Sequence, residues 1–126
     1  MSEHKYKVKF YQDIQGQQPI KKYLQDLANK TDKDSRIKLG SIDYHLQLLR
    51  KYGTRAGEKI TKHIKDDIWE LRPLKDRIFF FYWKDDTFIL LHHFRKSTPK
   101  TPQREIEQAQ RNLEDFLKRS GDDEKK

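Results

Sequence analysis

Two apolar runs in the second half of the chain limit the folds that it can adopt. "IFFFYW" at 78–83 and "FILL" at 88–91 are separated by the polar segment "KDDT", which is typical of a β-hairpin turn. Successive positions are apolar in both runs, so each strand must be covered on at least part of both faces. The chain therefore needs a sheet with this hairpin at its interior, and helices that pack on the sheet.

The first part of the chain predicts a strand followed by a helical hairpin. Basic and apolar residues alternate from Lys5 to Phe10, which is the pattern of a half-buried strand near a sheet edge. Helical spacing of apolar residues begins at Pro19 and, after polar capping residues at 29–35, resumes in a second helix that ends near Tyr52. That second helix carries two neighbouring apolar rows, namely Ile37, Tyr44 and Leu48, and Ile42, Leu46 and Leu49.

Two short strands are expected ahead of the central hairpin, at 59–64 and 67–73, and a helix after it. We expect Thr101 to cap this helix and Pro102 to lie in its first turn. Its apolar stripe consists of Ile106, Ala109, Leu113, Phe116 and Leu117. The predicted architecture is a single α+β domain over residues 1–119, with an antiparallel sheet, an N-terminal helical hairpin and a C-terminal helix in the order β-α-α-β-β-β-α. Residues 120–126 are expected to form a disordered tail.

The composition excludes several kinds of chemistry and favours an anionic partner. The chain has no cysteine, and its five histidines show no recognisable ligand spacing, so we expect no disulfide, no metal and no other cofactor. Lysine and arginine number 28 against 20 acidic residues, which gives a formal net charge of +8. Nucleic acid, an anionic membrane surface and an acidic protein all suit such a charge. Because the apolar runs are short and the first residues are charged, we expect no membrane association and a cytoplasmic location.

Basic residues and a histidine gather at the predicted strand ends. Arg72 ends one strand and Arg77 begins the next, so a meander brings their guanidinium groups together across a hairpin. Like charges in such a position are more stable when an anion bridges them, and arginine matches the geometry of phosphate. We assign His92 to the same site because it is predicted to share a face with Lys96. Alternation on the last strand places Leu90, His92, Phe94 and Lys96 on one face and Leu91, His93 and Arg95 on the other.

Such a group of side chains suits RNA cleavage without a metal. A 2′-hydroxyl attacks the adjacent phosphorus, cations stabilise the charge on the phosphorane oxygens, and a histidine transfers protons near neutral pH. Tyr82 and Phe94 are expected nearby, where they can stack on unpaired bases. Taken singly, each residue also has an ordinary structural explanation: an arginine paired with Glu70 or Asp76, a histidine bonded to backbone, or an aromatic ring in the core.

Taken in order, the motifs resemble a known family. "IWELRPLKDRIFFFYWKDDTFILLHHFRKSTPKTPQREIEQA", residues 68–109, closely resembles the C-terminal half of HigB-type toxins of the RelE/ParE superfamily. The resemblance implies a RelE-like fold and a toxin that cleaves mRNA on the translating ribosome and is silenced by a HigA-like helix-turn-helix antitoxin. It implies catalytic roles for Arg72, Arg77, His92 and Lys96. Residues expected to bind RNA are Lys62, Lys75, Tyr82, Phe94, Arg95 and Lys100.

The sequence departs from the family pattern at three positions. Ser97 replaces the second lysine of a pair, His93 stands where a small residue is usual, and Arg95 occupies a position that is often apolar. The assignment of general acid and general base therefore stays open. Two alternative functions also remain, namely a ParE-like inhibitor of DNA gyrase and a basic binding module of a mobile element with no enzymatic role. Clustering of Arg72, Arg77 and Lys96 favours the nuclease.

Overall fold

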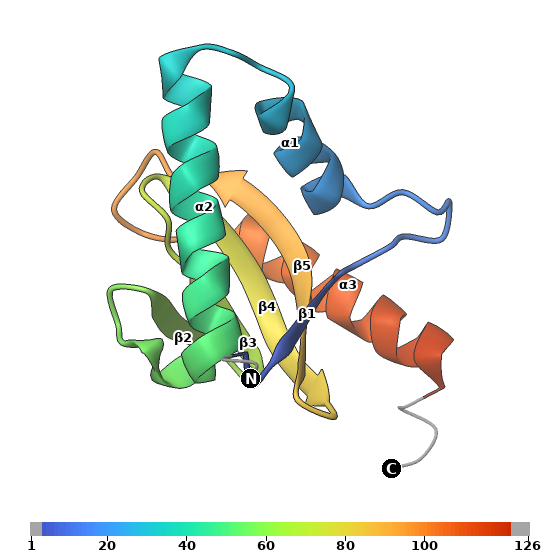
Figure 1. Cartoon of the computed structure of the whole chain (residues 1–126). Helices are drawn as coiled ribbons and strands as arrows, with labels where there is room; N and C mark the ends of the chain where they lie inside the picture. The colour runs from blue at the N-terminus through green and yellow to red at the C-terminus, as the bar shows by residue number, and fades with distance from the viewer. Residues whose placement is uncertain (1–3, 122–126) are drawn as a thin grey trace.

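A computed structural model describes residues 4–121 of the chain. Its α+β architecture confirms the predicted fold class (Figure 1). Four strands separate the helical hairpin from the last helix, in agreement with the four predicted segments, although the order β-α-α-β-β-β-α counted only three; residues 61–71 form a β-hairpin of their own. The elements are β1 (Lys7–Phe10), α1 (Pro19–Ala28), α2 (Lys33–Tyr52), the 3₁₀ helix η1 (Gly53–Ala56), β2 (Thr61–Lys65), β3 (Ile68–Leu71), β4 (Asp76–Lys84), β5 (Thr87–Arg95) and α3 (Gln103–Ser120).

The five strands form one mixed sheet in the order β1-β5-β4-β3-β2. Strands β2 to β5 make the predicted antiparallel meander, and β1 lies at an edge, as expected. The sheet is not wholly antiparallel, however, because β1 pairs in parallel with β5. Asp85 and Asp86 connect β4 to β5 with φ values of 53° and 57°, the left-handed conformation that a tight hairpin turn requires.

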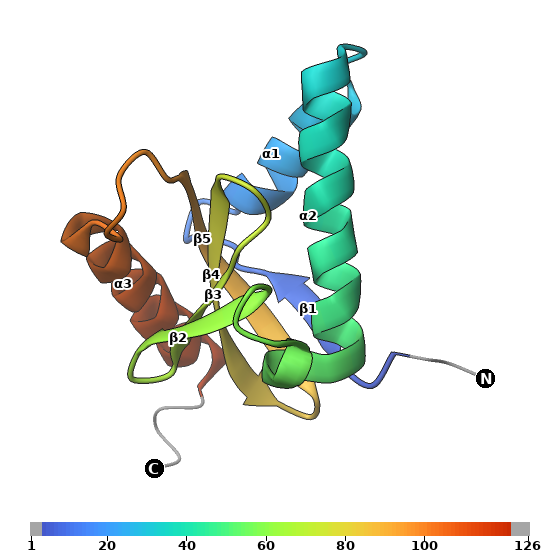
Figure 2. The ribbon, with the colours of Figure 1, turned by 90° about the vertical axis from the view of Figure 1, so that its left-hand side faces the viewer.

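Helices cover the two faces of the sheet, as Figure 2 shows, with α1 and α2 on one side and α3 on the other. We call these the α1/α2 face and the α3 face. Phe80 of β4 packs toward the α1/α2 face and its neighbour Phe79 toward the α3 face, and both are fully buried. The prediction of an interior hairpin covered by helices on both sides is therefore confirmed. No helix in the described part of the chain combines the length and apolarity that crossing a bilayer demands.

The prediction for α2 was partly wrong. On α2, the row Ile42, Leu46 and Leu49 is buried as expected, whereas Ile37 and Tyr44 of the other predicted row are 50% and 59% exposed.

The N-cap of α2 comes from the predicted polar segment at 29–35, because Asp32 accepts a hydrogen bond from the backbone N–H of Ser35.

Helix α3 has the predicted apolar stripe but not the predicted cap. Pro102 occupies the N-cap position, and the hydroxyl of Thr101 instead donates to Glu70 Oε1 across the loop. The helix continues through Ser120, and Gly121 follows it with a left-handed φ of 81°. Residues 122–126 of the expected tail lie outside the described residues.

A bulge in β5 changes which side chains share a face. Phe79 of β4 pairs with His92, but the next residue, Phe80, pairs with Leu90, so β5 has one extra residue at this point. Leu90 therefore faces α1 and α2, while Phe94 packs on the α3 side. The prediction that Leu90 and Phe94 share a face was wrong, because it assumed uninterrupted alternation.

Candidate functional site

Two arginines surround one buried carboxylate at the end of β3 and the start of β4. Glu70 is 1% exposed, and its Oε2 lies 3.4 Å from Nε of Arg72 and 3.8 Å from Nε of Arg77. The predicted proximity of the two guanidinium groups is confirmed. The anion that bridges them in this structure belongs to the chain itself, and we call these three residues the arginine cluster.

Backbone carbonyls fix the direction of both arginines. Arg72 Nη1 donates to the carbonyl of Glu58 at 2.9 Å, and Arg77 Nη1 donates to those of Leu74 and Asp76 at 2.7 and 2.8 Å. Both Nε–H groups are buried and find no hydrogen-bond acceptor among residues 4–121. Burial, and to a smaller extent the charge of Arg72, lowers the pKa of Arg77, and the charge of Glu70 opposes this shift. The cluster thus holds concentrated positive charge in a fixed geometry.

A histidine–carboxylate pair lies on the same face of the sheet. His92 Nε2 is 2.6 Å from Oε1 of Glu105, in the first turn of α3, and both side chains are partly exposed. His92 pairs across the strands with Phe79, which in turn pairs with Glu70, so one row crosses β3, β4 and β5. Because the carboxylate holds one ring nitrogen, the orientation of the imidazole is set and the other nitrogen can serve a substrate.

Four lysines predicted for the site belong to elements at or near this end of the sheet. Lys96 follows β5, and its backbone N–H donates to the carbonyl of Lys75 in the β3–β4 turn at 2.7 Å. Lys62 lies directly opposite Glu70 in the β2–β3 register and is exposed. Lys100 is exposed in the loop that leads to α3. Figure 1 shows that the β3–β4 turn and this loop lie at the same end of the sheet.

Two predicted aromatic residues lie elsewhere or are covered. Tyr82 is five residues after Arg77 on β4, roughly 17 Å away along the strand, and its ring packs against Phe88 of the opposite face. The expectation that it lies near the arginines was therefore wrong. Phe94 is on the correct face but only 8% exposed, with its ring against Phe79, so it offers little surface to a base.

Arg95 belongs to a second polar cluster on the α1/α2 face that the sequence did not predict. The buried carboxylate of Asp76 contacts His93 Nε2 at 2.8 Å, the hydroxyl of Tyr23 at 2.9 Å and Arg95 Nη1 at 3.1 Å. Burial alone raises the pKa of Asp76, but the hydrogen bonds from His93 and Tyr23 and the charge of Arg95 lower it overall. His92 and His93 point in opposite directions, as predicted. The His93 ring stacks on Tyr23 of α1, and this contact connects α1 to the sheet.

Sequence reasoning named Glu70 only as an ordinary structural partner of an arginine, a pairing that the structure confirms, and it missed Glu105. Glu70 and Arg72 are two residues apart in "WELR", so on a strand their side chains point to the same face, and this spacing indicates that they can pair. Glu105 is distant from His92 in sequence, and no local pattern connects them. Among residues 4–121, no group of three or more histidine or acidic side chains is arranged to hold a metal ion.

The mixed sheet with helices on both faces is compatible with the RelE-like fold, which defines a class of small basic toxins. Comparison with protein families assigns the chain more closely: it belongs to the phage-derived Gp49-like family (DUF891), whose model matches residues 26–114. This is a family of toxins of toxin–antitoxin systems, related to RelE- and HigB-type toxins. Membership implies an antitoxin partner. No curated protein matches the sequence.

Proposed function

We propose that this toxin is a HigB-like endoribonuclease that cleaves mRNA on the translating ribosome in the cytoplasm and is silenced by a helix-turn-helix antitoxin. The observation that carries the proposal is the arginine cluster beside the His92–Glu105 pair on one face of the sheet. A gyrase inhibitor that acts by protein binding has no need for two guanidinium groups fixed next to an oriented imidazole.

The proposed reaction needs only side chains of the chain. The 2′-oxygen bonds to the adjacent phosphorus and the P–O5′ bond breaks, which leaves a 2′,3′-cyclic phosphate and a 5′-hydroxyl. Arg72, Arg77 and Lys96 stabilise the negative charge that builds on the phosphorane oxygens. His92 transfers a proton to or from the reacting oxygens, and Glu105 keeps its ring oriented.

The test is cleavage of a translated mRNA by the purified toxin, mapped by primer extension. Arg72→Ala and Lys96→Ala are each expected to lower the cleavage rate by about 10²–10³-fold, which is the usual effect of losing one transition-state donor. Arg36→Ala, which removes an exposed cation of α2, is the matched control and should keep the wild-type rate. Cuts should follow the reading frame. Intact transcripts together with supercoiling defects in toxin-expressing cells would contradict the proposal and favour gyrase inhibition.

A further inference from the structure

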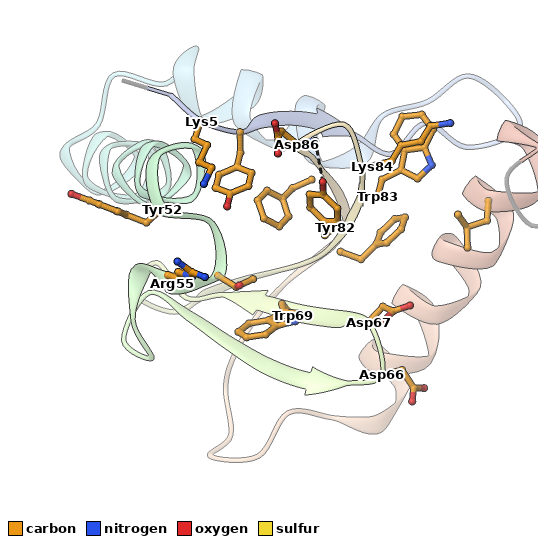
Figure 3. Close-up of a pocket in the computed structure, with 15 residues that line it drawn as sticks. Lys5, Tyr52, Arg55, Asp66, Asp67, Trp69, Tyr82, Trp83, Lys84 and Asp86 are labelled. Atoms are coloured by element: carbon orange, nitrogen blue, oxygen red, sulfur yellow. Dashed lines mark hydrogen bonds between the residues drawn. The ribbon is translucent and has the colours of Figure 1, made fainter. Parts of the chain in front are cut away.

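A groove of about 820 Å³ lies at the end of the sheet farthest from the arginine cluster. Its walls come from the end of α2 with η1, the β2–β3 turn, and the β4–β5 hairpin, as Figure 3 shows. Nothing in the proposed cleavage reaction uses this groove.

Aromatic side chains form much of the lining. Trp69 and Trp83 are the two tryptophans of the chain, and both line the groove. Tyr52 and Tyr82 also line it and are 46% and 48% exposed, which is unusual for rings of this size. Contact with Phe88, at 5.5 Å between ring centroids, holds the Tyr82 ring in place. The groove therefore presents flat apolar surfaces that are already positioned.

Charged residues are distributed unevenly along the groove. Figure 3 shows Lys5 and Arg55 near Tyr52 at one end and Asp66 and Asp67 at the other, while Asp86 and Lys84 line the groove from the β4–β5 hairpin. A ligand with an anionic group, a flat ring and amino donors matches this order. A nucleotide of adenine, guanine or cytosine has all three, since its phosphate can meet the cations, its base can stack on the rings, and its amino group can donate to the carboxylates.

We infer that the groove binds a nucleotide of single-stranded RNA, with its base stacked on Tyr82 and Trp69 and its phosphate at Arg55. This inference rests on the proposed function, because it gives the RNA substrate a second point of contact. Trp69 of β3 precedes Arg72 by three residues, roughly 10 Å along the chain. Its ring packs on the α1/α2 face, whereas Glu70 of the arginine cluster shares the α3 face with Phe79. Lys62 is exposed on the neighbouring strand beside this stretch. An RNA strand cut at the arginine cluster would therefore pass around the edge strand β2 to reach the groove on the other face.

The test uses an oligoribonucleotide with 2′-methoxy groups, which binds but cannot be cleaved. Because both tryptophans line the groove, RNA binding should quench the intrinsic fluorescence of the full-length toxin. Tyr82→Ala should weaken binding by about 10-fold or more, the usual effect of losing one stacking ring. Tyr82→Phe, which keeps the ring, should bind like the wild type. Tyr44→Ala, which removes an exposed tyrosine outside the groove, is the matched control.

A second variant separates stacking from phosphate contact. Arg55→Ala should weaken binding and reduce the slope of log affinity against log salt by about one. Unchanged affinity in both Tyr82→Ala and Arg55→Ala would overturn the inference. Quenching by the cognate antitoxin but not by RNA would also overturn it, and would identify the groove as a protein-docking surface.

Cleavage assays distinguish this inference from the proposed function. If the wild type cuts mRNA in an Arg72-dependent way while the groove variants bind RNA normally, only the groove inference fails. If the groove variants lose RNA binding but the wild type cuts no RNA, the groove stands and the proposed nuclease activity fails.

Discussion

Replacing Glu70 by glutamine should destabilise the fold because it removes the counter-ion of two arginines. Loss of one partner from a buried ion pair costs about 3–5 kcal/mol. Arg72 and Arg77 keep 25% and 12% of their side-chain surface exposed, so some hydration remains and the low end of this range applies. We expect a loss of about 3 kcal/mol, which for a domain of this size lowers the melting temperature by roughly 10 °C.

Urea unfolding at pH 7 measures this effect, with Glu114→Gln as the matched control because that glutamate is exposed on α3. Added sulfate should stabilise Glu70→Gln more than the wild type, since the uncompensated arginines would bind the anion in place of the carboxylate. A loss below about 1 kcal/mol, equal to that of the control and insensitive to sulfate, would refute the role assigned to Glu70.

Four further predictions concern other parts of the molecule. His92→Gln should lower the single-turnover cleavage rate by about 100-fold, whereas His93→Gln should act mainly on stability. A rate within threefold of the wild type, about 0.7 kcal/mol, would remove His92 from the mechanism. Because the folded-state pKa of Asp76 lies below its usual value of 3.8, its stabilising effect is present above that value and is lost as the pH falls through the folded-state pKa. Asp76→Asn should therefore flatten the acid limb of the stability profile, measured by thermal unfolding across pH. Burial and the hydrogen bond to Asp115 raise the pKa of Tyr11 to about 12, so its phenol should still be neutral near pH 11 in an ultraviolet titration. Tyr11→Phe should reduce the amplitude of this late step, to which Tyr23 also contributes because burial and its hydrogen bond to Asp76 raise its pKa. Association with the antitoxin, followed by stopped flow, should slow as salt rises if acidic residues of the antitoxin cover the basic site, and salt-independent rates would argue for an apolar contact on the helical hairpin.

The central features of the fold follow from local pattern. The apolar runs at 78–83 and 88–91 require cover on both faces, and only helices remained to provide it. The proximity of Arg72 and Arg77 was equally predictable, because a short hairpin connects their strands. Both inferences depend on residues that are near one another in sequence.

The errors have a common physical origin in contacts between distant segments. The extra residue in β5 depends on how two strands match in register, which alternation in one strand cannot reveal. Helical periodicity gave α2 two apolar rows, but only the position of the sheet determines that Leu46 is buried and Tyr44 is exposed. The contact between His92 and Glu105 likewise requires knowing how α3 docks.

The parallel pairing of β1 with β5 has a consequence for synthesis of the toxin. Lys7 pairs with Thr87, so β1 cannot pair until β5, which lies much later in the chain, has been made. The candidate site also stays incomplete until Thr101 and Glu105 have been made, because Thr101 contacts Glu70 of the arginine cluster and Glu105 orients His92. The candidate site therefore forms only after segments far apart in the chain have come together, so a partly synthesised or partly unfolded chain lacks it.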